Sequence, residues 1–214
     1  MRTRIIQYLH RPNGTELGLT GTHDTYLLIK SDIDLHGLFP VGIQQEFIDV
    51  ETQKPYFLKS AESREFRVNQ MGEFYRDKGL RPGDDIVIQK IISQSNEEAN
   101  NSKLFISAQR FNRITFIKNR QGYDIANLDV LPNFTEQQKK YEIIICWNGE
   151  IGTLRIEFAT SDYKRSDSPE KTDYYRILFN DDPITDKHLI LTLGEINVLS
   201  PFEKYEYHEI IWDN

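Results

Sequence analysis

Cysteine is almost absent from this chain of 214 residues. The single one, Cys146, lies in the apolar run Tyr141–Trp147, which predicts a buried structural thiol and not a nucleophile. One cysteine excludes a disulfide within the chain, and five scattered histidines provide no recognisable spacing of zinc ligands. We therefore expect no disulfide scaffold, no metal site and no cofactor.

Long apolar stretches are also lacking. No run approaches the roughly 18 residues that a membrane span needs, and no charged segment followed by an apolar one stands at the N-terminus, as in a secretory leader. These absences predict a cytoplasmic protein that has no membrane partner. The composition, with 38% hydrophobic and 28% charged residues, is that of a folded globular protein and excludes intrinsic disorder.

A net positive charge is the third absence. The formal net charge is −7, which argues against nucleic acid because DNA binding relies on Lys and Arg to neutralise phosphates. The distribution is uneven, however: residues 1 to 120 carry 17 basic and 15 acidic side chains, whereas residues 121 to 214 carry 9 and 18. This distribution favours the N-terminal half for DNA binding, although a clustered face matters more than a total.

Short alternating or β-branched runs dominate the chain and predict strands. In the first half these runs lie at 4–9, 25–29, 45–50, 55–58, 64–68, 85–92 and 103–108. One short helix is predicted at 72–79, where Gly79 is placed to end it, and the polar stretch 93–102 is predicted to be an exposed hairpin loop. The fold class that follows from these patterns is mainly β, a β-rich barrel interrupted by one short helix.

The sequence changes character beyond about residue 115. Further strands are predicted near 144 and at 154–158, 174–179 and 189–193, with a polar loop at 160–171 and an acidic turn at 180–183. We expect three parts: the first barrel at 1–115, a connection at 116–140 and an acidic β-rich unit at 141–214, with the boundary lying anywhere from about 112 to 140. The aromatic and acidic tail 201–212 would repel phosphates, so we expect it to pack on a partner or on its own barrel.

Two segments concentrate groups that can bind nucleic acid. The loop Gly18–Tyr26 combines glycines, which let the backbone approach a ligand, with small hydroxyls that can bond phosphate oxygens. The segment Ser63–Gln70 is dense in groups that read base edges, since Arg reads guanine, Asn or Gln reads adenine and Glu accepts from cytosine. Strand alternation divides this segment into two faces: Arg64, Phe66 and Val68 on one, and Glu65, Arg67 and Asn69 on the other. An ordinary solvent-exposed strand face is the competing interpretation.

Together these stretches resemble one family. The loop Gly18–Tyr26, the run Leu38–Pro40, the run Arg64–Arg67 and the turn Leu80–Asp84 are similar to the N-terminal effector domain of EcoRII-type restriction endonucleases. That domain is a B3-like DNA-binding pseudobarrel, also similar to plant B3 transcription-factor domains. The resemblance covers about residues 1 to 115 and implies an open pseudobarrel with one or two short helices. It also implies two arms that clamp the major groove of double-stranded DNA, at Gly18–Tyr26 and Ser63–Gln70.

The resemblance also implies which residues contact DNA and in what setting. The expected base contacts are Arg64, Glu65, Arg67 and Asn69. The expected phosphate contacts are Thr20, Thr22, His23, Thr25, Lys30 and Arg76. Asp24, Tyr26 and Gln70 are the remaining residues that we expect to contact DNA. The protein would be the reader of a restriction or phage-defence system, with a nuclease or ATPase supplied by a partner chain or a missing domain. Methylation preference, base flipping and homodimerisation stay open.

Catalysis within the chain is the first alternative. A restriction-type nuclease needs a carboxylate followed by an acidic-x-Lys triplet, so that two carboxylates hold Mg²⁺. The one such triplet is Asp162-Tyr163-Lys164, with Glu150 and Glu157 upstream, and it lies in the predicted polar loop. We expect no catalytic site here, and Mg²⁺ only if this alternative holds. A second alternative is a protein-interaction module without DNA binding, suggested by the net charge of −7.

Overall fold

The computed structural model describes residues 2–19, 25–29, 35–95, 98–135, 139–163 and 171–213. These residues form sixteen strands, one α-helix and one 3-10 helix, which confirms the expected mainly β class. The described part of the chain contains no helix that is long and apolar enough to cross a membrane. The chain divides into two compact units, one of residues Met1–Arg110 with Lys204–Asn214 and one of residues Phe111–Glu203.

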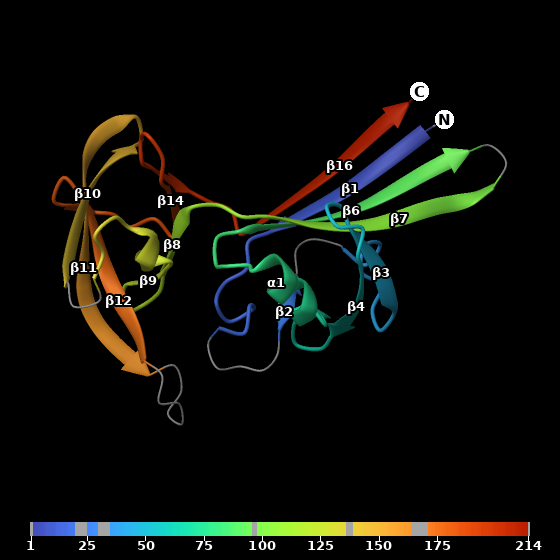
Figure 1. The fold of residues 1–214 in the computed structure, drawn as a ribbon, viewed down its shortest axis with the longest axis horizontal. Helices are drawn as coiled ribbons and strands as arrows, with labels where there is room; N and C mark the ends of the chain where they lie inside the picture. Colours follow the sequence, from blue (N-terminus) through green and yellow to red (C-terminus); the bar gives the residue numbers. More distant parts are fainter. Residues whose placement is uncertain are drawn as a thin grey trace. The chain divides into compact units, whose positions relative to one another are not determined.

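The first unit is built on one sheet of eight strands. Their order is β16, β1, β6, β7, β3, β4, β5, β2, and the neighbours β16, β1, β6 and β7 run side by side in Figure 1. The strands are β1 (Arg2–His10), β2 (Tyr26–Ile29), β3 (Gln44–Asp49), β4 (Pro55–Glu62), β5 (Phe66–Asn69), β6 (Asp85–Ser95), β7 (Glu98–Gln109) and β16 (Tyr205–Asp213). Within the described residues, β16 and β2 each pair on one side only, so the sheet is open, as the pseudobarrel prediction requires.

The core of the first unit follows from strand alternation. In β4 the side chains of Tyr56, Leu58 and Ser60 are buried while those between them are exposed. The one helix, α1 (Gly72–Lys78), buries Phe74, whose ring meets Tyr56 edge to face with centroids 5.2 Å apart. The helix ends at Gly79, which adopts the left-handed conformation with φ 58° and ψ 44°. The prediction of this helix and its end is confirmed.

The polar stretch 93–102 is more ordered than a loop. Strand β6 continues to Ser95 and β7 begins at Glu98, and Ser93 lies opposite Asn101 in their ladder. The prediction of a loop over the whole stretch was wrong. Backbone groups pair between strands whatever the side chains are, so a polar sequence reports solvent exposure and not the absence of a strand.

The second unit is a closed barrel of seven strands. Their order is β11, β10, β15, β14, β8, β9, β12, and β12 pairs with β11 to close the ring, while β13 pairs with β12 outside it. The strands are β8 (Arg113–Lys118), β9 (Tyr123–Ala126), β10 (Lys140–Trp147), β11 (Glu150–Tyr163), β12 (Lys171–Phe179), β13 (Asp182–Pro183), β14 (His188–Thr192) and β15 (Val198–Pro201), with the 3-10 helix η1 (Leu128–Val130). A second β-rich unit is therefore confirmed.

These units differ from the expected ranges 1–115, 116–140 and 141–214. The expected connection contains β8 in part, β9 and η1, all of which belong to the barrel. The tail returns to the first unit, where β16 pairs with β1 from Asp213 opposite Arg2 to Tyr205 opposite His10. With these boundaries the first unit carries 15 basic and 18 acidic side chains and the barrel 11 and 15. The charge difference between the two halves of the sequence is therefore not a difference between the two folded units.

Two smaller expectations about the barrel are corrected. Cys146 is half-buried and not a core residue, because alternation along β10 turns its neighbour Ile145 inward. Residues 160–163, expected in a polar loop, continue β11 and pair with β12, for example Asp162 with Thr172. The apolar run around Cys146 thus did not determine which of its side chains points inward, and the polar residues 160–163 did not end the strand.

A buried polar network joins the C-terminal segment to the first unit. His10 and Glu16 are 0% and 1% exposed, and His10 Nε2 lies 2.7 Å from Glu16 Oε1. Lys204 Nζ lies 2.8 Å from the other oxygen of this carboxylate. The backbone N–H groups of Asn13 and Leu28 also donate to it, at 3.0 and 2.9 Å. One carboxylate thus connects β1, the loop after it, β2 and the segment that leads into β16.

The network shifts the pKa values of its members. Burial lowers the pKa of His10 against the opposing charge of Glu16. For Glu16, burial alone would raise the pKa, but the interactions with His10 and Lys204 outweigh it and lower the pKa to about 2. At neutral pH we therefore assign a neutral imidazole that donates to an ionised carboxylate.

We predict that the first unit loses stability on acidification. The unfolded chain protonates His10 below about pH 6.5 and Glu16 below about pH 4.5, while the folded unit resists both protonations. Stability should fall from about pH 6.5 downward, and fall further between about pH 4.5 and 2, where the unfolded chain binds a proton that the folded Glu16 does not. Urea unfolding, followed by the fluorescence of Trp212 in a Trp147→Phe background, measures this.

The variant Glu16→Gln should unfold at lower urea concentration at pH 7 and show a weaker pH dependence between about pH 4.5 and 2. The matched control is Glu73→Gln, which removes an exposed carboxylate from the helix of the same unit. A free energy of unfolding that stays constant from pH 7 to 3 in the parent chain would contradict the assignment.

Candidate nucleic-acid interface

The segment Ser63–Gln70 forms a turn and a short strand on the open sheet. Residues 63–65 form an exposed bend between β4 and β5. Along β5, Phe66 and Val68 are buried, whereas Arg67 and Asn69 are half-exposed on the opposite face. The alternation predicted for residues 66–69 is therefore confirmed. Arg64 is exposed in the bend before the strand, so alternation does not determine its direction.

The guanidinium of Arg67 is held from two sides. Glu65 accepts two hydrogen bonds from it, one of them from Nε at 2.8 Å. On the other side, the guanidinium carbon lies 4.1 Å from the centroid of the Tyr26 ring, a cation–π contact. Tyr26 belongs to β2 and lies opposite Asn69 of β5. Tyr26 of the first predicted segment and Glu65 of the second therefore contact the same arginine.

The first predicted segment is described only at its ends. Its start forms a turn in which Gly18 has φ 75° and the N–H of Leu19 donates to the carbonyl of Gly14 at 2.8 Å. The N–H of Tyr26 donates to the carbonyl of Glu16 at 3.2 Å, which connects the end of the loop to the buried network. Outside the described residues lie Thr20, Thr22, His23, Asp24 and Lys30.

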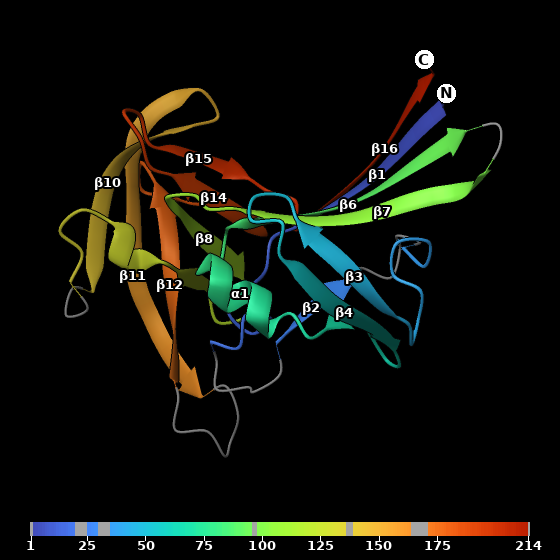
Figure 2. The ribbon, with the colours of Figure 1, turned by 45° about the vertical axis from the view of Figure 1, so that its right-hand side comes forward.

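The remaining expected residues lie around the helix and the end of β5. The hydroxyl of Tyr75 on α1 donates to the carbonyl of Tyr26 at 2.9 Å. A methyl group placed on Gly72 would lie 2.6 Å from Thr25 Oγ1 and 3.4 Å from Arg76 Nη1, so these two side chains lie together at the start of the helix. Figure 2 shows α1 beside β2 and β4. The fold thus brings Thr25, Tyr26 and Arg76 together.

Strand register adds two residues that the sequence did not single out. Tyr26 lies opposite Asn69, Asn69 opposite Lys59, and Lys59 opposite Gln44, which makes a row across β2, β5, β4 and β3. Beside it, Gln44 donates to Gln70 Oε1 at 3.3 Å. The four side chains of the row are exposed or half-exposed. Alternation predicts that Lys59 points outward, but only the register shows that it neighbours Asn69.

The three acidic residues of the nuclease alternative lie on the barrel. Asp162, on β11, accepts a hydrogen bond from Gln121 at 3.2 Å. Glu150 and Glu157 lie on the same strand, and Lys164 falls outside the described residues. Within the ranges that the structure describes, no group of three or more His, Cys, Asp or Glu side chains could hold a metal ion.

No protein-family model matches this chain, and no curated protein matches it. Several solved structures resemble it distantly, among them two with the following similarity. One is a complex of FUS3 from Arabidopsis with DNA, at 16% identity and a TM-score of 0.35, covering 48% of this chain and 94% of that chain. The other is the N-terminal domain of LlaJI.R1 from Helicobacter pylori, at 9% identity and a TM-score of 0.32, covering 49% of this chain and 81% of that chain.

The hydrogen bond from Tyr75 to the carbonyl of Tyr26 should contribute to stability. Replacing it in Tyr75→Phe leaves a covered carbonyl without this donor, and we expect the first unit to lose about 1 kcal/mol. The measurement is urea unfolding followed through Trp212. The control Tyr174→Phe, on the barrel, should leave that transition unchanged. Equal midpoints for Tyr75→Phe and the parent chain would show that the hydroxyl does not hold β2 against the helix.

Proposed function

We propose that the outer face of β2, β5 and β4, together with the bend Ser63–Glu65, reads base pairs in double-stranded DNA. The observation that carries this proposal is the fixed guanidinium of Arg67, held between Glu65 and Tyr26 beside Asn69. We call this surface the reading face, defined by Tyr26, Lys59, Arg64, Glu65, Arg67, Asn69 and Gln70.

The side chains of the reading face match the chemistry of the major groove. Arginine donates two hydrogen bonds to O6 and N7 of guanine, and the amide of Asn or Gln pairs in the same way with adenine. Arg67 is oriented by contacts with two side chains of its own unit, which lowers the conformational entropy lost on binding. We assign Arg67, Asn69 and Gln70 to base edges, and Arg64 and Glu65 to the same role at the exposed bend.

The neighbouring side chains suit phosphate contacts. Lys59, exposed on β4, and Arg76, exposed on α1, can neutralise phosphates, and the hydroxyl of Thr25 lies beside Arg76. The first unit as a whole carries more acidic than basic side chains, so long-range attraction to DNA is weak. We therefore expect a large share of the affinity to come from the local contacts of this face.

The biological setting rests on the resemblance to EcoRII-type effector domains. Under the proposal, the chain is the sequence-specific reader of a restriction or phage-defence system, and a partner chain or a further domain supplies the nuclease or ATPase. The recognised sequence and the effect of cytosine methylation are found by selecting bound duplexes from a random pool, with and without methylation.

The first test removes the two arginines of the second segment. In the full chain, Arg64→Ala with Arg67→Ala should weaken binding to the selected duplex by about 1 to 3 kcal/mol for each bidentate arginine–guanine pair that the variant cannot form. The preference over a scrambled duplex should shrink at the same time. The matched control is Arg176→Ala on β12, whose side chain is 70% exposed and lies in the other unit. Fluorescence anisotropy with labelled duplexes measures both affinities.

Arg67→Lys separates base reading from charge. Lysine keeps the positive charge but lacks the planar fork, so affinity for the scrambled duplex should persist while selectivity falls. Unchanged affinity and selectivity in both arginine variants would refute the reading face. Binding of the parent chain that does not weaken with salt, or no binding at all, would favour the protein-interaction alternative.

The second test concerns Lys59. If this side chain contacts one phosphate, Lys59→Ala should weaken binding to all duplexes alike and reduce the slope of log K against log salt by about 1. Lys103→Ala, an exposed lysine on β7 of the same unit, should leave the slope unchanged. A loss of selectivity in Lys59→Ala would instead assign Lys59 to a base edge, and equal slopes for the two variants would remove it from the interface.

A further inference from the structure

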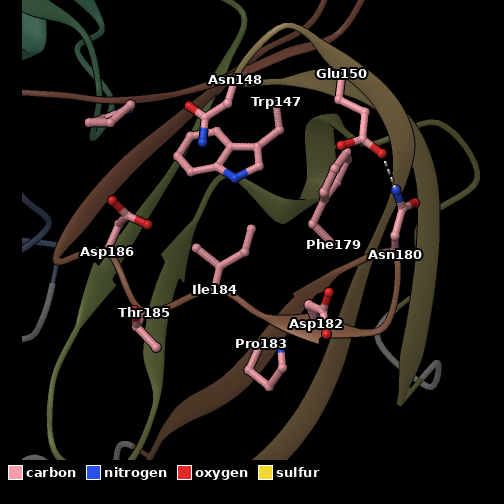
Figure 3. A pocket seen from close by; sticks show the side chains of 11 residues that line it. Trp147, Asn148, Glu150, Phe179, Asn180, Asp182, Pro183, Ile184, Thr185 and Asp186 are labelled. Atoms are coloured by element: carbon pink, nitrogen blue, oxygen red, sulfur yellow. Dashed lines mark hydrogen bonds between the residues drawn. The ribbon is translucent and has the colours of Figure 1, made fainter.

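The barrel contains a cavity of about 370 Å³ that plays no part in the reading face (Figure 3). All the residues that line it belong to the unit Phe111–Glu203. Its volume lies in the range typical of small-molecule sites. The cavity and the reading face therefore share no residue.

Two tight turns frame the cavity. Asn148 and Gly149 connect β10 to β11, and Asn180 and Asp181 connect β12 to β13. All four have positive φ, between 49° and 83°, as two-residue hairpin turns of the I′ type require. The side chain of Asn180 joins the turns, because it accepts from the N–H of Thr153 at 2.9 Å and donates to Glu150 at 3.0 Å.

The remaining wall is held from inside the barrel. The buried hydroxyl of Tyr123 lies 3.1 Å from the carbonyl of Ile184 and 2.7 Å from that of Asp186 and can donate to either. A methyl group on Gly152 would lie 2.6 Å from the ring of Phe179, so glycine lets that ring pack against β11. These contacts, all within the barrel, hold the wall of the cavity in place.

The lining combines aromatic rings with carboxylates. Figure 3 shows the rings of Trp147 and Phe179 at the cavity, with Glu150, Asp182 and Asp186 on three different sides of it. No lysine, arginine or histidine is among the described residues that line it. Carboxylates without a lining cation, next to an indole, attract a positive charge through charge-assisted hydrogen bonds and cation–π contact.

We propose that this cavity binds the guanidinium or ammonium head of an organic cation. The three carboxylates lie on different sides of the cavity, and the described residues hold no group of three or more His, Cys, Asp or Glu side chains that could bind a metal ion. A guanidinium fits better than an ammonium, because its planar fork pairs with a carboxylate while its face stacks on an aromatic ring. The cation is a free small molecule or an arginine side chain of a partner protein.

The test uses the fluorescence of Trp147 in the full chain with Trp212→Phe, which removes the other tryptophan. The probes are acetyl-arginine methylamide, the matching lysine and citrulline compounds, and butylguanidine. We expect a saturable change with the arginine compound, a weaker one with the lysine compound and none with citrulline, which has the same shape without the charge. No saturation with any cation, or an equal response to citrulline, would overturn the proposal.

The two sources of the cation are distinguished by butylguanidine. Equal affinity for butylguanidine and acetyl-arginine methylamide shows that the head alone is recognised, as for a free small molecule. Tighter binding of the arginine compound shows that the peptide groups contribute, as for a partner protein. Either result supports the site.

Variants test which carboxylates act. Asp186→Asn and Asp182→Asn should each raise the Kd of the arginine compound by about tenfold, which corresponds to one charge-assisted hydrogen bond. The control Glu195→Gln removes one exposed charge from the same unit outside the cavity and should leave Kd unchanged. An increase in Kd for Glu195→Gln as large as that for Asp186→Asn would mean general attraction and refute the site. Urea unfolding followed through Trp147 establishes that each variant is folded. If Asp186→Asn does not fold, Asp182→Asn provides the test.

Discussion

The first unit depends on one buried carboxylate. Glu16 connects His10 on β1, Lys204 before β16 and the backbone N–H groups of Asn13 and Leu28. A buried charge is costly unless it is paired and fully hydrogen-bonded, so these segments cannot separate without leaving a charge uncompensated. Two of the segments begin far apart in the sequence, and the C-terminal strand reaches the sheet only after the chain has completed the barrel.

The same carboxylate determines where the reading face can form. Because Glu16 accepts from Leu28 and its carbonyl accepts from Tyr26, strand β2 is held at the edge of the sheet. There Tyr26 lies opposite Asn69 and stacks on Arg67. The orientation of the arginine is therefore a consequence of packing several residues away. A buried polar group here holds the strand that positions an exposed one.

Local patterns in the sequence predicted the individual strands and the helix better than the boundaries between the two units. Alternation placed Phe66 and Val68 inward, and Gly79 marked the end of the helix, because burial and backbone conformation are local properties. The return of β16 to β1, the closure of β12 on β11 and the row from Tyr26 to Gln44 depend on register between distant strands, which no local pattern encodes. The role of Glu16 was missed for the same reason, since one of its partners, Lys204, lies 188 positions away in the sequence.

Predictions of function from net charge meet the same difficulty, because they depend on which parts of the sequence fold together. Division of the sequence at residue 120 gave halves of different net charge. In the folded chain the C-terminal tail belongs to the first unit, and each unit carries a small excess of acidic side chains. Charge acts through the surface on which it lies, at distances of about a Debye length, near 10 Å. On the first unit the relevant surface holds Lys59, Arg64 and Arg67, whereas the described lining of the barrel cavity contains carboxylates and no cation. Under the two proposals, units of nearly equal net charge bind ligands of opposite charge.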